Sequence, residues 1–282
     1  MDTSPDGDST LPAETRLGRV ALRVDDLDAT TAFYRDVIGL AVLAWDGTIA
    51  TLGAGGTPLL ELTADPDAPD RGRANAGLFH TAFRVPSRGA LGDALTRIRE
   101  RWELDGASDH DVSEALYLAD PEGNGVEVYR DRPRESWTGT PDGGVRMTTE
   151  PLDVGGVAAA AAGEDRAPPD TDVGHVHLEV TSLDAFERFY IATFGFDSRA
   201  RYPDARFVAA GGYHHHVGAN TWNGRTDPAA GRGLDWFEVV VPGDEARREL
   251  RDRLGVDADS TAGDGFAVTD PDGIEVRVGD GR

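Results

Sequence analysis

The chain contains two copies of one segment, and this repeat limits what it can fold into. Residues 17–40 and 173–196 align at a constant offset, and ten of the 24 aligned positions are identical. A fixed period of this kind indicates duplicated structural units. Where the first copy has Arg19 and Ala21, the second has His175 and His177. We therefore expect one copy to act as a scaffold and the other to carry a site.

Each copy has the pattern of a βαβββ unit. In the first, an alternating strand precedes Asp26, which can cap a helix over 29–37, and Gly39 can end that helix. Three short strand patterns follow the helix. A further unit begins at Gly77, and both are repeated in the second half. The predicted fold class is α+β, with four βαβββ modules paired into two cup-shaped mixed-sheet domains.

The predicted domains follow the order of the units along the chain. Residues 1–15 form an acidic, disordered tail, and residues 16–135 form an N-terminal pair of units with a degenerate site. Residues 136–172, rich in Pro, Gly and Ala, form a linker with a short helix near 158–162. Residues 173–282 form a C-terminal pair of units that holds a metal site.

The composition limits the partners and the compartment. All 28 basic residues are Arg, and 51 acidic residues give a net charge of −23. Such a surface repels nucleic acid and anionic membranes, and it is typical of a salt-adapted cytoplasm. Cysteine is absent, which excludes disulfides and thiolate chemistry. No apolar run is long enough to span a bilayer, and a soluble, cytoplasmic protein is expected, with homo-oligomers left open.

Several motifs resemble those of a known superfamily. The first strand of unit three reads G-H-V-H-L-E-V over 174–180, an F-Y pair lies in each repeated helix, and residues 120–128 read D-P-E-G-N-G-V-E-V. Together they resemble the vicinal oxygen chelate superfamily of glyoxalase I, bleomycin-binding proteins and extradiol dioxygenases. The whole pattern is most similar to the catechol 2,3-dioxygenase branch.

This resemblance implies a metal site in the C-terminal half. His175 matches the first ligand position, and Glu275 matches the carboxylate on the last strand of unit four. Trp236 stands where a second His is usual, so we expect the run His214, His215 and His216 to supply it. The last strand of unit three is expected over Tyr213 to Val217, and strand parity favours His215. Two His and one carboxylate form the ligand set of non-haem Fe(II) oxygenases.

A second candidate set lies in the N-terminal half. Glu61, His80 and Glu127 match three ligand positions of the glyoxalase arrangement, and Arg19 occupies the fourth. Because Arg cannot ligate a metal and its charge opposes a cation, we expect a remnant in which Arg19 pairs with Glu61 or Glu127. Metal binding by this set is the alternative.

The implied function is an Fe(II) extradiol dioxygenase that cleaves catechol-type diols with O₂. Mn(II) is the other metal that fits. His177, His214 or His216 would remove the second catechol proton, and Tyr213 would hydrogen-bond the oxygen species. The alternatives are a metal-dependent glyoxalase-like lyase or isomerase, and a metal-free binding protein of the bleomycin-resistance kind.

Overall fold

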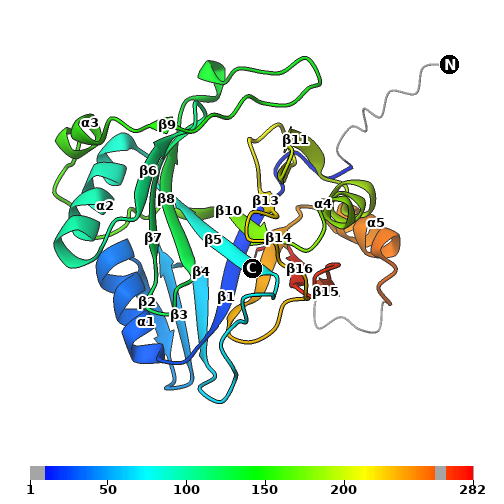
Figure 1. Cartoon of the computed structure of the whole chain (residues 1–282), viewed down its shortest axis with the longest axis horizontal. Helices are drawn as coiled ribbons and strands as arrows, with labels where there is room; N and C mark the ends of the chain where they lie inside the picture. Colours follow the sequence, from blue (N-terminus) through cyan, green and yellow to red (C-terminus); the bar gives the residue numbers. More distant parts are fainter. Residues whose placement is uncertain (1–9, 258–264, 282) are drawn as a thin grey trace.

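The computed structural model describes residues 10–257 and 265–281, which form two mixed β-sheets with helices on their outer faces (Figure 1). The first sheet has the strand order β15-β16-β14-β1-β4-β3-β2. Its strands are β1 (Arg16–Val24), β2 (Ala41–Trp45), β3 (Ile49–Ala54), β4 (Thr57–Ala64), β14 (Gly233–Val240), β15 (Phe266–Thr269) and β16 (Glu275–Gly279). The prediction of an α+β fold built from four repeated units in two mixed sheets is confirmed, and in the described residues the fourth unit has two strands, β15 and β16, after its helix.

The second sheet has the strand order β11-β12-β13-β10-β5-β8-β7-β6-β9. Its strands are β5 (Gly77–Arg84), β6 (Gly106–Asp109), β7 (Ser113–Ala119), β8 (Gly125–Asp131), β9 (Glu150–Pro151), β10 (Asp172–Glu179), β11 (Asp197–Tyr202), β12 (Ala205–Ala209) and β13 (Val217–Asn220). The α-helices are α1 (Leu27–Phe33), α2 (Arg88–Arg101), α3 (Val154–Ala159), α4 (Leu183–Phe186) and α5 (Asp244–Leu254). Turns of π-helix continue α1 over Tyr34–Ile38 and α4 over Glu187–Phe194, and a 3₁₀ turn covers Arg134–Ser136.

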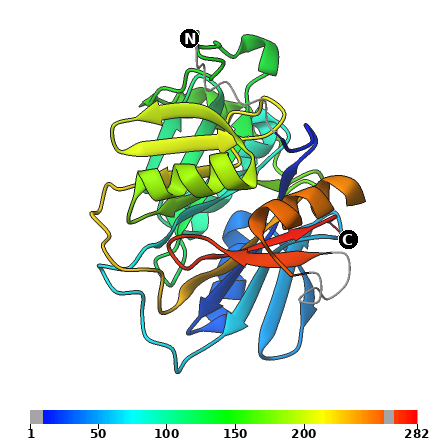
Figure 2. The ribbon, with the colours of Figure 1, turned by 90° about the vertical axis from the view of Figure 1, so that its right-hand side faces the viewer.

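The units pair in a different order from the predicted one. The first sheet joins unit one to unit four, because β1 pairs antiparallel with β14. The second joins unit two to unit three, because β5 pairs antiparallel with β10. The division into a 16–135 pair and a 173–282 pair is therefore wrong for sheet pairing. The first strands of all units have similar patterns, and the sequence did not distinguish their partners. Figure 2 shows units one and four together in the lower half of the molecule.

Local signals place the helices where they were expected. The Asp26 carboxylate accepts a hydrogen bond from the Ala29 N–H at 2.9 Å, which caps α1. Gly39 adopts φ = 93° at the end of the following π-helical turn, a conformation that glycine tolerates best. The Tyr34 hydroxyl donates to Asp120 at 3.1 Å, in the turn before β8. Consecutive units are thereby linked although they lie in different sheets.

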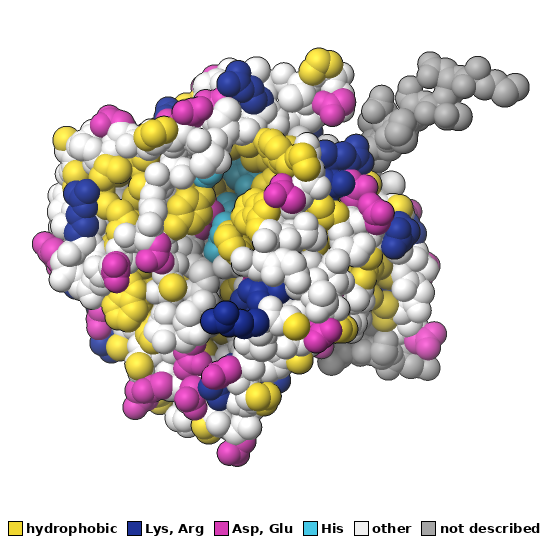
Figure 3. All heavy atoms as spheres, viewed as in Figure 1, with side chains coloured by type: hydrophobic (Ala, Val, Ile, Leu, Met, Phe, Trp, Pro, Cys, Tyr) yellow, Lys and Arg dark blue, Asp and Glu magenta, His cyan; other side chains and the backbone are white. Residues whose placement is uncertain are grey.

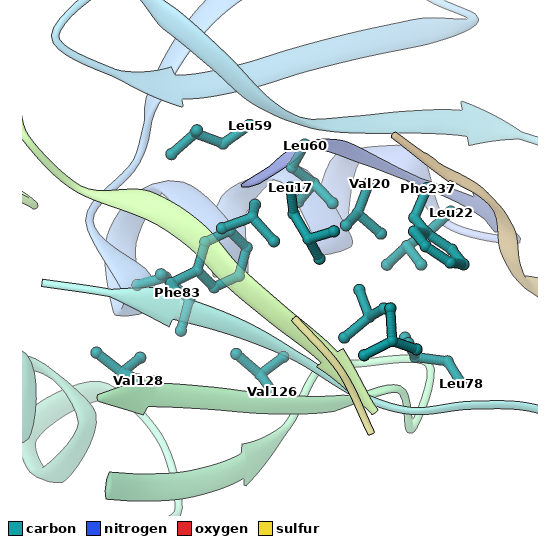
Figure 4. Close-up of a cluster of buried hydrophobic side chains, with 14 of the residues drawn as sticks. Leu17, Val20, Leu22, Leu59, Leu60, Leu78, Phe83, Val126, Val128 and Phe237 are labelled. Carbon is teal, nitrogen blue, oxygen red and sulfur yellow. The ribbon is translucent and has the colours of Figure 1, made fainter. Parts of the chain in front are cut away.

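The main hydrophobic core joins the two sheets to the helices (Figure 4). Leu22 of β1, Leu60 of β4 and Phe237 of β14 belong to it from the first sheet. Phe83 of β5 and Val128 of β8 belong to it from the second. The sheets therefore share one apolar core.

The segments outside the units are more ordered than predicted. Residues 1–9 of the predicted tail lie outside the described residues, but Leu11 is buried in the core and Thr10 donates a backbone hydrogen bond to Gly195. The predicted linker contributes the edge strand β9 and the helix α3, which packs on α2 and lies a few residues before the predicted helix. In the described residues, no helix has the length and apolar character needed to cross a bilayer.

Candidate metal centre

Three ligating side chains meet on neighbouring strands of the second sheet. His80 lies on β5, Glu127 on β8 and His175 on β10. Ala82 of β5 pairs with Glu127 on one side and with His175 on the other, so these two side chains share a face of the sheet. His80 lies two residues before Ala82 and therefore faces the same side. The small Ala82 side chain leaves space between the three larger ones.

The ligand atoms of this group are close enough to surround one ion. Glu127 Oε2 lies 3.0 Å from His80 Nε2 and 3.1 Å from His175 Nε2, and the two imidazole nitrogens are 3.3 Å apart. All three side chains are buried. Within 10–257 and 265–281, no other group of three His, Cys, Asp or Glu residues brings its ligand atoms this close together. Two imidazoles and one carboxylate fit a divalent metal such as Fe(II).

The electrostatics of the group suit metal binding. Burial lowers the pKa of His175 to about 4, and Glu127 only partly offsets this effect. Burial alone would raise the pKa of Glu127, but its interactions with His175 and His80 hold that pKa well below its usual range. The His175 imidazole is therefore neutral and the Glu127 carboxylate ionised near neutral pH, as metal ligands must be.

A cavity of about 700 Å³ opens above these side chains. Figure 3 shows histidine side chains at the bottom of a hollow that is bordered by hydrophobic ones. Its walls are largely apolar and aromatic, and include Phe79, Val112, Met147, Tyr202, Phe207 and Trp222. The cavity thus combines an apolar wall with a compact group of polar atoms, as small-molecule sites usually do.

A hydrogen-bonded pair, His110 and Tyr117, lies on one wall of the cavity. His110 Nε2 is 2.7 Å from the Tyr117 hydroxyl, and His110 Nδ1 is 2.5 Å from the Thr148 carbonyl oxygen. Tyr117 of β7 pairs directly with Glu127 of β8. Burial and the charge of Glu127 raise the pKa of Tyr117 well above its usual value, so its hydroxyl keeps its proton. Tyr117 was not among the predicted site residues, although a hairpin of β7 and β8 places it beside Glu127.

Comparisons with known proteins identify the family. The family model for the glyoxalase/bleomycin resistance protein/dioxygenase superfamily matches residues 16–128. A curated relative, the catechol-2,3-dioxygenase of Bacillus subtilis (strain 168), is 39% identical over 277 residues, which cover 93% of this chain and 96% of that protein. The chain belongs to this superfamily.

Two further known proteins match the chain in sequence or in fold. The biphenyl-2,3-diol 1,2-dioxygenase 3 of Rhodococcus globerulus is 34% identical over 128 residues, which cover 43% of this chain and 67% of that protein. Glyoxalase I from Zea mays has a similar fold, with a TM-score of 0.56, 15% identity and coverage of 95% of this chain and 93% of that one. The resemblance inferred from the sequence motifs is thus confirmed.

Glu275 does not lie with His175, so the predicted ligand set for this member of the superfamily is wrong. Glu275 belongs to β16 of the first sheet, where it accepts a hydrogen bond from Arg277 at 2.7 Å and pairs with Trp236. Strand β16 belongs to unit four, which forms part of the first sheet, whereas His175 lies in the second sheet. Glu127, the matching residue of unit two, occupies the position predicted for Glu275.

The four residues expected in one N-terminal site, Arg19, Glu61, His80 and Glu127, are divided between the two sheets. His80 and Glu127 lie in the second sheet, away from Arg19, whereas Glu61 lies beside Arg19 in the first. Arg19 pairs with Glu61 at 3.9 Å and with Glu238 at 3.7 Å. The predicted pairing of Arg19 with Glu61 is thus confirmed, and its charge does not oppose a metal at His80 and Glu127.

Of the three consecutive histidines, only His215 lines the cavity. Its ring centroid lies 4.0 Å from that of His175, but it is not one of the three clustered ligands. The predicted strand over 213–217 begins only at Val217, so the parity argument does not apply. His177 also lines the cavity, and burial together with His80 and His175 lowers its pKa well below the usual value.

The other predicted catalytic residues contact neighbouring side chains instead of the cavity. His214 Nε2 lies 2.9 Å from Asp131, and His216 Nδ1 accepts a hydrogen bond from the Ala210 N–H at 3.3 Å. The Tyr213 hydroxyl is 2.7 Å from that of Tyr129. His214, His216 and Tyr213 therefore do not line the cavity, because the turn before β13 directs their side chains into the protein interior.

Proposed function

We propose that this protein is an Fe(II)-dependent extradiol dioxygenase that opens the ring of catechol-type diols with O₂. The observation that carries the proposal is the buried His80, Glu127 and His175 group at an aromatic-lined cavity. The 39% identical relative named catechol-2,3-dioxygenase supports the same activity. The acidic composition supports a role in the cytoplasm of a salt-adapted cell.

The three ligands would hold iron through two imidazole Nε2 atoms and one carboxylate oxygen. When bound, the ion would supply Lewis acidity, one-electron redox chemistry and coordination positions that the three side chains leave open. The protein's own contribution is to hold a diol and O₂ in contact inside an apolar cavity. Phe79, Phe207 and Trp222 provide aromatic surfaces against which a substrate ring can pack.

Two groups are placed to handle the protons of the diol. Burial and the neighbouring His175 and His214 lower the pKa of His215 well below the usual value, so its ring is neutral and can accept a proton or a hydrogen bond. On another part of the lining, the Tyr117 hydroxyl keeps its proton and donates a hydrogen bond to His110 Nε2, because His110 Nδ1 donates to the Thr148 carbonyl oxygen. His215 can thus accept a diol proton, and the Tyr117 oxygen can accept a hydrogen bond from a diol hydroxyl.

The charge of the cavity lining favours diols whose ring substituents are uncharged. Its acidic residues are Glu127 and Asp204, and no Arg is among the residues that line it. A carboxylate on the substrate ring would lose water without gaining a cationic partner. We expect kcat/KM for 4-methylcatechol to exceed that for 3,4-dihydroxybenzoate by about tenfold or more, equivalent to about 1.4 kcal/mol. Thr149→Arg, which adds a cation at an exposed lining position, should narrow the ratio.

The deciding experiment measures oxygen uptake and metal content together. The protein is loaded anaerobically with Fe(II) in molar salt and given catechol and air, while the yellow ring-opened product is followed. We expect oxygen uptake that matches the product formed. Iron binding without oxygen uptake would refute the dioxygenase and leave a lyase or isomerase. Ligand binding that is unaffected by chelator in a metal-free protein would indicate a binding protein instead.

Two carboxylate variants distinguish the observed ligand set from the one expected from sequence. Glu127→Ala removes the buried carboxylate and should abolish both iron binding and oxygen uptake. Glu275→Ala is the matched control, because Glu275 lies in the first sheet and outside the cavity. It should leave iron content and kcat unchanged. Loss of iron in Glu275→Ala with retention in Glu127→Ala would overturn the assignment.

A further inference from the structure

A chain of hydrogen bonds leads from the cavity wall into the protein. His215 Nδ1 lies 2.7 Å from His214 Nδ1, and His214 Nε2 lies 2.9 Å from an Asp131 carboxylate oxygen. The His214 side chain is only 1% exposed, whereas that of Asp131 is 21% exposed. Asp131 ends β8, the strand that carries Glu127. The three residues thus connect a cavity-lining imidazole to a carboxylate that is not part of the metal group.

The donor and the acceptor in each of these hydrogen bonds follow from Asp131, the last residue of the series. An ionised carboxylate only accepts hydrogen bonds, so His214 must carry a proton on Nε2. A neutral imidazole has one N–H, so His214 Nδ1 is then an acceptor. The facing nitrogen, His215 Nδ1, must therefore be the donor. This arrangement leaves His215 Nε2 unprotonated, and that nitrogen makes no hydrogen bond with any other described residue.

The surroundings of Asp131 hold its carboxylate in place. The Arg84 guanidinium donates to one carboxylate oxygen at 3.0 Å, and the Tyr213 hydroxyl lies 3.0–3.1 Å from both. The Trp137 ring packs beside His214, with its centroid 5.3 Å away. Arg84 thus pairs with the same carboxylate to which His214 is hydrogen-bonded. The carboxylate is therefore fixed in the orientation that determines the tautomer of His214.

We propose that Asp131 and His214 are positioning residues that fix His215 as the Nδ1–H tautomer, with the Nε2 lone pair available in the cavity. The use of that lone pair to accept a diol proton rests on the proposed function. The tautomer of His215 can be observed in the metal-free protein, because an exchange of tautomers does not change the charge of the imidazole. A defined acceptor on a buried imidazole removes the need to exchange tautomers before the proton is transferred.

The first test is the tautomer of each histidine, read from ¹⁵N chemical shifts and long-range ¹H–¹⁵N correlations by NMR. The spectra are taken on metal-free protein at pH 8 in molar salt, where an ordinary imidazole is neutral. We expect the proton of His214 on Nε2 and that of His215 on Nδ1. A wild-type spectrum with the His215 proton on Nε2 would overturn the proposal, and this measurement requires no variant.

The second test is Asp131→Asn, which should reverse both tautomers. Arg84 can only donate, so it keeps the amide oxygen on its side and turns the amide NH₂ towards His214. The NH₂ then donates to His214 Nε2, which moves the His214 proton to Nδ1 and that of His215 to Nε2. Tyr213→Phe is the matched control, since it removes a neighbour of Asp131 but keeps the carboxylate, and it should leave both tautomers unchanged.

The kinetic consequence separates this proposal from the function on which it rests. In the iron-loaded enzyme, Asp131→Asn should lower kcat by about 10²–10⁴-fold with little change in KM, the usual effect of losing acid–base catalysis. Unchanged tautomers in folded Asp131→Asn, or an unchanged kcat, would refute the positioning role. The expected tautomers in a protein that consumes no oxygen with catechol would refute the dioxygenase but leave the His215 tautomer assigned.

Discussion

His216 is buried in its neutral form, and the free energy of unfolding should therefore fall in acid. Its side chain is close to fully buried, and its Nδ1 accepts a hydrogen bond from the Ala210 N–H, which requires an unprotonated nitrogen. Burial, together with the charge of Arg84, lowers its pKa to about 3. In the unfolded chain the same imidazole titrates near 6.5.

The size of this effect at pH 5 depends little on the folded pKa. Because the folded pKa is depressed, the unfolded state binds the extra proton, and stability is lost as pH falls from about 6.5 towards 3. A pH of 5 lies about 1.5 units below the pKa of His216 in the unfolded chain, and each unit corresponds to about 1.36 kcal/mol of stability. His216 alone should therefore cost about 2 kcal/mol between pH 8 and pH 5.

The assay is denaturant unfolding of metal-free protein at pH 8 and pH 5 in molar salt. In His216→Asn, the Asn oxygen can replace Nδ1 as the acceptor but does not titrate. The loss of stability between the two pH values should be about 2 kcal/mol smaller in this variant than in the wild type. Phe196→Leu, which changes packing beside His216, should lower stability equally at both pH values. A pH dependence in His216→Asn equal to that of the wild type would refute the reasoning.

Three other substitutions test the packing around the site. Gly174→Ala would place a Cβ 1.7 Å from the Tyr129 hydroxyl, so we expect a loss of about 1–3 kcal/mol in denaturant unfolding, and wild-type stability would contradict the close approach. Glu179→Gln would leave the side chain of Arg225, 2.8 Å away, without its buried carboxylate, at a cost of about 3–5 kcal/mol, and an unchanged thermal midpoint would exclude this. Arg97→Leu removes buried donors to backbone carbonyls of the first π-helical turn, so amide hydrogen exchange should accelerate there, and unchanged protection would show that these bonds are dispensable.

The local structure was predictable because its signals lie within short segments. Alternating apolar residues located the first strand of each unit, and Asp26 and Gly39 marked the ends of the first helix. The duplication itself was visible from the residues that repeat, including the F-Y pairs. Each of these signals acts over a few residues and does not depend on which strands become neighbours.

The ligand set was harder to predict because it depends on strand pairing between units. Glu127 and Glu275 occupy matching positions in units two and four, and only the pairing of β5 with β10 selects Glu127. One clue to this choice was Trp236 of the first sheet. It pairs with Ala21, and its ring centroid lies 3.9 Å from the Arg277 guanidinium carbon. A cup filled by a large ring and a cation has little room for a metal.

The run of three histidines was misjudged for a different reason. A strand would have placed alternate side chains on the same face, but residues 211–216 form turns and bends. In such a segment the side chains point in directions that no simple period describes. Only the contacts with Asp131 and His175 decide which imidazole reaches the cavity.

The pairing of β1 with β14 also orders events during translation. The ribosome makes β1 early, but the strand that covers one of its edges begins only at Gly233. At about 5–20 residues per second, that edge waits on the order of tens of seconds for its partner. An open edge next to buried Leu17 and Val20 is a site where nascent chains can associate, and chaperones would act there. The strands that carry the candidate metal ligands are complete once β10 has emerged, so this sheet can begin to close while unit four is still being synthesised.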